Sequence, residues 1–86
     1  GEAEGGKRAS NKRSYNLQRE LEQLPQRLEQ LEAELEAIQA KVGDAEFFNQ
    51  PHDVTQKTLS DLTTAEKALE EAFERWEYLE ALKNGA

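Results

Sequence analysis

From Leu17 onward, an apolar residue recurs at alternating steps of four and three residues. The positions are Leu17, Leu21, Leu24, Leu28, Leu31, Leu35, Ile38 and Val42. This period of about 3.5 residues is the heptad repeat of a coiled-coil helix. Gly43, which tolerates left-handed backbone geometry, and the turn-forming Asp44 come directly afterwards. The pattern therefore predicts a first helix over about 15–42.

A second seam has the same period and runs through Thr55, Thr58, Leu62, Ala65, Leu69, Ala72, Trp76 and Leu79, flanked by Leu59, Phe73 and Leu82. It predicts a second helix over about 53–83, which begins either with an Asp53–Gln56 capping box or with Pro51 in its first turn. The loop 43–52 contains Phe47 and Phe48, and we expect both rings to fold over the tip. Two amphipathic helices joined by so short a loop bury their seams most readily against each other. The sequence thus predicts an all-α fold, a two-helix antiparallel intramolecular coiled-coil hairpin.

Pro25 interrupts the first seam. A proline inside a helix removes one hydrogen bond and clashes with the carbonyl of Leu21, at a cost of about 3 kcal/mol. We expect a kink there, with a short helical or 3₁₀ segment before Pro25 that packs Tyr15, Leu17 and Leu21 against the end of the second helix. Whether Pro25 kinks or breaks the helix stays open. The predicted structural core is Leu17, Leu21, Leu28, Leu35, Leu62, Leu69, Phe73, Trp76 and Leu79.

Charge changes the picture at the N-terminus. Residues 1–14 hold four basic and two acidic side chains, whereas residues 15–86 hold seven basic and sixteen acidic ones. We interpret residues 1–13, which lack a large apolar residue, as a flexible basic linker or as residues left by cloning, since the chain opens on Gly1 and not Met. An antiparallel hairpin brings both chain ends together, so its base should be relatively basic. The candidate nucleic-acid-binding residues are Lys7, Arg8, Lys12, Arg13, Arg19, Arg27, Arg75 and Lys83, although Arg75 could instead pair with Glu20.

Several kinds of chemistry find little support. Without cysteine there is no thiolate metal site or thiol nucleophile, and His52 is the single histidine, so we expect no metal site and no catalytic residue. Residues 1–7 fit the opening of a phosphate-binding loop, but Arg8 replaces the magnesium-binding hydroxyl and no strand precedes it. No apolar run approaches the roughly 20 residues that cross a bilayer. Trp76, Tyr15 and Tyr78 could stack on bases, although the seam position of Trp76 favours packing.

Two segments carry a more specific signal than the heptads. The run from Tyr15 to Pro25 (YNLQRELEQLP) and the closing run from Phe73 to Leu82 (FERWEYLEAL) resemble the C-terminal domain found in a branch of the bacterial ABC-F proteins, which carry two ATP-binding cassettes and no membrane domain. The resemblance covers about residues 14–85. It implies a cytoplasmic ATPase whose C-terminal hairpin binds DNA and supports DNA transactions and ribosome-linked work.

What the resemblance implies for this chain is a nonenzymatic, sequence-nonspecific DNA-binding accessory domain without a cofactor, membrane or small-molecule substrate of its own. ATP, magnesium and ATP hydrolysis would belong to the parent. The alternative is a protein-interaction or regulatory strut that docks on the ATPase core or the ribosome through its acidic faces and the Phe47 and Phe48 tip.

Overall fold

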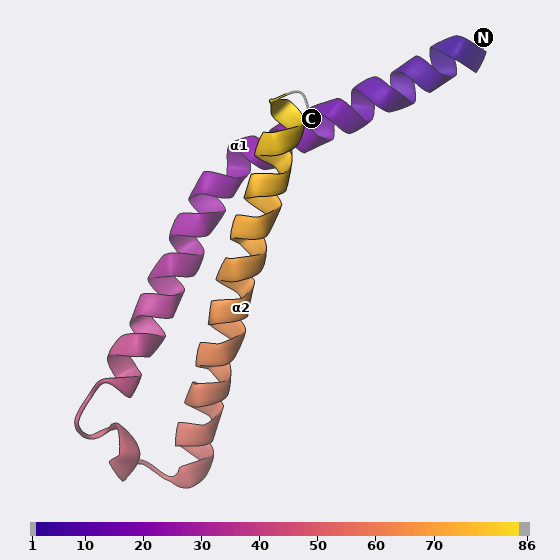
Figure 1. Ribbon diagram of the computed structural model, residues 1–86. Coiled ribbons are helices and arrows are strands. Elements are labelled where there is room, and N and C mark those ends of the chain that lie inside the picture. The colour runs from indigo at the N-terminus through magenta and orange to yellow at the C-terminus, as the bar shows by residue number, and fades with distance from the viewer. Residues whose placement is uncertain (1, 85–86) are drawn as a thin grey trace.

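Two long helices lie side by side in opposite directions in the computed structural model (Figure 1). It describes the backbone of residues 2–84 and the side-chain surroundings of residues 14–84. Helix α1 covers Glu2–Val42, a 3₁₀ turn η1 covers Phe47–Asn49, and α2 covers His52–Lys83. The antiparallel helical hairpin predicted from the two seams is confirmed.

The seams meet along the length of the hairpin. Every seam residue from Leu17 to Leu79 is buried or half-buried, and Leu21, Leu24 and Leu79 form one apolar cluster against which Leu17 and Trp76 pack. Leu24 and Leu31 are buried, although the predicted core omitted them. Phe73 was expected in the core but remains 39% exposed, because a pair of helices covers its seam positions and leaves the flanking positions open to solvent.

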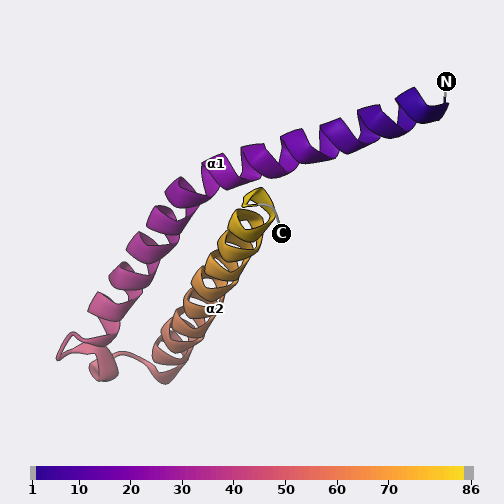
Figure 2. The same cartoon turned by 45° about the horizontal axis from the view of Figure 1, so that its top comes forward.

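Pro25 lies inside α1 and does not break it. The helix is assigned without interruption through Pro25, so the segment before it is α-helical and continuous with the rest. The ribbon changes direction where α1 passes the C-terminal end of α2 (Figure 2). Pro25 itself is exposed, and this position lets the helix curve around its missing hydrogen bond. Of the two outcomes left open by the sequence, a break of the helix at Pro25 is therefore wrong.

The N-terminal segment differs from its predicted backbone. Residues 2–13, expected to be an irregular linker, continue α1 to Glu2 and project beyond the end of α2 (Figure 1). Adding a residue to an existing helix costs far less than starting one, so a polar segment can extend a helix that the seam has already fixed. The flexibility of this segment stays a prediction.

At the tip, the two phenylalanines separate. Phe47 is 1% exposed and Phe48 71% exposed, and their rings meet edge to face with centroids 4.8 Å apart. The expectation that both rings cover the tip is thus wrong for Phe48. A three-residue 3₁₀ turn cannot aim two consecutive side chains at the same core, because they point in different directions around its axis.

The ends of the connecting segment also depart from the predicted capping. Pro51 is the N-cap of α2, and its carbonyl accepts hydrogen bonds from the backbone N–H groups of Val54 at 3.0 Å and Thr55 at 3.1 Å. Asp53 therefore lies inside the first turn, and the capping box is wrong. At the other end, Gly43 donates to the Gln39 carbonyl at 2.9 Å. A Cβ at Gly43 would lie 3.3 Å from that oxygen, which is a tight contact, so glycine suits this position for space and not for left-handed geometry.

Candidate nucleic-acid interface

Most of the basic residues lie in the half of the hairpin that contains both chain ends. Lys7, Arg8, Lys12 and Arg13 belong to the part of α1 that projects beyond α2, and their side chains lie outside the described ones. The other four candidates, Arg19, Arg27, Arg75 and Lys83, stand on the paired parts of α1 and α2, and all four are exposed. The tip half holds only Lys41, Lys57 and Lys67.

Arg75 forms the one ion pair between the helices in the described part of the chain. Its Nε donates to Glu20 Oε2 at 2.7 Å and its Nη2 donates to Glu20 Oε1 at 3.0 Å. These hydrogen bonds hold the pKa of the Glu20 carboxyl below its ordinary value and raise the pKa of Arg75. The pairing that the sequence left as the alternative for Arg75 is therefore present, so a phosphate at this position would compete with a carboxylate.

Two arginines accompany exposed tyrosines. The Arg75 guanidinium lies 5.4 Å from the centre of the Tyr78 ring, and Arg19 Nη1 donates to the Tyr15 hydroxyl at 3.4 Å. Tyr15 is 61% and Tyr78 51% exposed, whereas Trp76 is half-buried against the core cluster. Both pairs were missed in the sequence, although their spacings of four and three residues place each pair on one helix surface.

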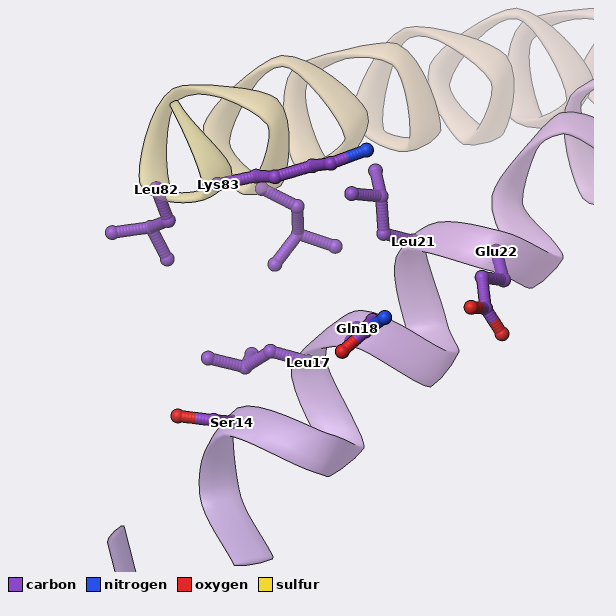
Figure 3. A pocket seen from close by; sticks show the side chains of 8 residues that line it. Ser14, Leu17, Gln18, Leu21, Glu22, Leu82 and Lys83 are labelled. Carbon is purple, nitrogen blue, oxygen red and sulfur yellow. The ribbon is translucent and has the colours of Figure 1, made fainter. Parts of the chain in front are cut away.

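A groove opens where α1 diverges from the last turns of α2. Apolar side chains of both helices line it, and the Lys83 side chain extends along it toward Leu21 (Figure 3). Its volume is about 360 Å³. The polar side chains at its edge include Gln18 and Glu22 (Figure 3). Lys83 thus joins the base of the hairpin through its aliphatic stem while its ammonium group stays exposed.

Heptad positions on either side of the seam divide the hairpin into two faces. In an antiparallel pair, like flanking positions lie beside each other, as the Glu20–Arg75 pair shows. We call this side the mixed face, because it carries both signs of charge: Glu20, Arg27, Glu34, Lys41, Asp61, Ala68, Arg75 and Leu82. The opposite side, which we call the acidic face, holds at the equivalent positions Gln18, Pro25, Glu32, Gln39, Leu59, Glu66, Phe73 and Glu80.

Other kinds of site find no geometry in the described residues. Among residues 14–84, whose side chains the structure describes, no three His, Asp or Glu side chains gather in a group able to hold a metal ion. None of the described helices is long and apolar enough to cross a membrane. Gly5 and Gly6 lie within helix α1 and not in a loop, so they do not fit a phosphate loop for ATP.

Comparisons with known proteins place this hairpin at the end of longer chains. The family model described as "ABC transporter C-terminal domain" matches residues 12–81. The chain is 69% identical over 83 residues to the ATP-binding protein Uup of Escherichia coli K12, which covers 96% of this chain and 13% of that protein. It is 53% identical over 75 residues to the ATP-binding protein Uup-like of Haemophilus influenzae, covering 87% of this chain and 16% of that protein.

A solved structure agrees with these relatives. It is the C-terminal domain of the Uup protein, described as a DNA-binding coiled coil motif; it is 71% identical, has a TM-score of 0.76, and the match covers 84% of this chain and 85% of that one. The chain thus spans between an eighth and a sixth of the curated relatives' length. The resemblance inferred from the Tyr15–Pro25 and Phe73–Leu82 segments is confirmed, and the chain belongs to the ABC transporter C-terminal domain family, in the form found in the Uup proteins.

Proposed function

We propose that this chain is a DNA-binding accessory domain that contacts phosphates at the base of its hairpin and along the projecting part of α1. The observation that carries the proposal is the solved Uup domain described as a DNA-binding coiled coil motif, at 71% identity and a TM-score of 0.76. Seven of the eleven basic residues lie at this base or on this projection, and Arg27 lies near the middle of the hairpin. Binding of this kind neutralises phosphates and releases counterions without reading base edges, so it is insensitive to sequence.

The exposed tyrosines give this surface a second mode of contact. Tyr78 lies beside Arg75 and Tyr15 beside Arg19, which is the combination of ring and cation on which unpaired bases stack. Duplex binding uses the cations alone, whereas single-stranded or branched DNA would use the rings as well. Comparing these forms of DNA with ribosomal RNA separates the candidate ligands.

A salt titration with matched variants tests the proposal. Neutralising Lys12, Arg13 and Arg19 together to Gln should weaken binding and reduce the slope of log affinity against log salt by up to about three. The matched control neutralises Lys41, Lys57 and Lys67 of the tip half, which changes the net charge equally. Equal weakening by both triple variants would show that DNA responds only to net charge and would overturn the assignment to the base.

The remainder of the parent protein supplies ATP chemistry in this proposal. As in the ABC-F proteins, ATP and magnesium bind in cassettes outside this chain, the parent hydrolyses ATP in the cytoplasm, and the hairpin acts as its DNA-binding appendage. Deleting this domain from the parent should lower DNA affinity while leaving the ATPase rate of the cassettes measurable.

A second candidate function is docking of the tip on the ATPase core or the ribosome. Phe48 favours it, because a ring that is 71% exposed is held edge to face on the buried Phe47. Phe48→Ser tests the contact without removing the core ring. Loss of parent function with unchanged DNA binding by the isolated hairpin supports tip docking, and unchanged parent function excludes it.

A further inference from the structure

The acidic face contains an apolar recess that the hairpin does not fill. Pro25 and Leu28 of α1 line it together with Phe73 and Trp76 of α2, and Glu29 and Glu32 stand at its rim. Pro25 is exposed, Phe73 is 39% exposed and Trp76 is half-buried. The proline ring itself forms part of the wall. Two rings and a proline thus meet solvent at one place along the hairpin.

The surroundings of this recess carry a single sign of charge. The flanking positions of the acidic face include Glu32, Glu66 and Glu80, and the next positions outward on the same side add Glu22, Glu36, Glu70 and Glu77 by helical spacing. At these positions within the described residues there is no Lys or Arg. On the mixed face, by contrast, Arg75 and Glu20 neutralise each other.

We propose that this recess docks a basic amphipathic helix of a protein partner. The helix would place an apolar side chain against Phe73, Trp76 and Pro25, and its Lys or Arg residues would pair with Glu29 and Glu32. Helices recognised in this way present apolar anchors at i and i+3 or i+4, and aromatic side chains in the centre of an interface provide a large share of its affinity.

Charge complementarity selects this occupant over two others. DNA is excluded, because its phosphates would approach a surface with several carboxylates and no cation. A second copy docking through the same face would set acidic rim against acidic rim, since such a two-fold contact brings like surfaces together. The basic segment 2–13 of a second copy has no large apolar residue to enter the recess.

Trp76 makes the recess directly observable, because it is the only tryptophan in the chain. A display library of random helical peptides is first passed over the Phe73→Ala variant to remove peptides that bind without Phe73. The remaining peptides are then selected for binding to the wild-type chain. Selected peptides should carry Lys or Arg beside an apolar stripe, and a synthetic copy of one should shift the Trp76 emission. Phe73→Ala should weaken that peptide at least about thirtyfold. Phe48→Ala, which removes an exposed ring at the tip, should not.

Charge reversal provides a second variant that leaves the recess intact. Glu29→Lys with Glu32→Lys should weaken a basic peptide by about tenfold or more at low salt. Glu34→Lys with Glu71→Lys changes the charge equally on the other side of the hairpin and should have a much smaller effect. Circular dichroism confirms that each variant retains its helices.

Several results would overturn the proposal. The selection could yield acidic or neutral peptides, or no peptide whose binding depends on Phe73. The two double charge reversals could weaken peptide binding equally. Sedimentation could show that the chain forms a dimer that depends on Phe73. A Trp76 response to DNA that Phe73→Ala abolishes would equally overturn it. DNA binding at the base is measured separately on the same variants and should not change with Phe73→Ala, so failure of this proposal is distinct from failure of the proposed function.

Discussion

The two faces of the hairpin share one seam but differ in everything that lies beside it. On the mixed face, Glu20 and Arg75 cross between the helices as an ion pair, whereas at the same level of the acidic face Pro25 and Phe73 leave an apolar recess. The seam determines that two helices pair, and both faces depend on it equally. The flanking residues contribute little to that pairing and instead determine which partners each face can accept.

The largest expected effect is a loss of folding stability when a buried seam residue is truncated, because both faces depend on the seam. Leu79 is 2% exposed within the core cluster, so Leu79→Ala should lower the free energy of unfolding by about 2–5 kcal/mol. Leu82→Ala, one turn further along, removes a side chain that is 38% exposed and should cost less than about 1 kcal/mol. Urea unfolding measures both, and equal losses would contradict the seam as the common support.

A smaller expected effect is a change in DNA affinity that differs between the mixed face and the acidic face. Glu20→Gln removes the carboxylate that holds Arg75 and frees the guanidinium for phosphate, so DNA affinity at low salt should rise by about threefold to tenfold. Glu29→Gln removes the same charge from the acidic face without releasing a cation, and should raise DNA affinity less. Fluorescence anisotropy with labelled DNA compares the two. If both substitutions act equally, the Glu20–Arg75 pair does not restrain binding.

The smallest effect concerns pH. Because Arg75 holds the pKa of Glu20 below its ordinary value, the pair contributes stability above the unfolded-state pKa of Glu, about 4.3, and loses it as pH falls through the lower folded-state pKa. Both side chains are partly exposed, at 43% for Arg75 and 39% for Glu20, so solvent screens this contribution. The unfolding midpoint of the wild type should slightly exceed that of Glu20→Gln at pH 7, and this difference should disappear near pH 3. A difference that persists there would contradict this origin.

The two heptad seams allowed the fold to be predicted from the sequence. Apolar residues at alternating steps of three and four specify the paired surfaces, so the hairpin, its direction and the half-burial of Trp76 could all be predicted. Phe73 and Phe48 could not be placed in this way, because hydrophobicity shows that a ring favours burial and does not show whether a neighbour is there to cover it. The extension of α1 to Glu2 depends on propagation from a helix already formed, which composition alone does not reveal.

The candidate interface was less predictable than the fold. The basic residues could be found by their charge, and the antiparallel topology indicated that they gather at one end. Whether Arg75 forms an ion pair with Glu20 depends on the register between the two helices. The sequence does not fix that register, so it gave the pair only as an alternative to phosphate binding. The recess on the acidic face depends on the position of Pro25 opposite Phe73, and neither residue signals it alone.

The register of the hairpin also suggests the order in which contacts between the two helices form during folding. Glu20 and Arg75 are 55 positions apart in the chain, whereas the residues on either side of η1 are separated only by the connecting segment. Loop-closure entropy rises with this separation, so contacts near Phe47 can form first and the helices can zip toward their open end. In this order the base would close last, although it holds the Leu21, Leu24 and Leu79 cluster. A ligand that must touch both helices at the base therefore recognises only the completely zipped molecule, and its binding reports that folding has finished.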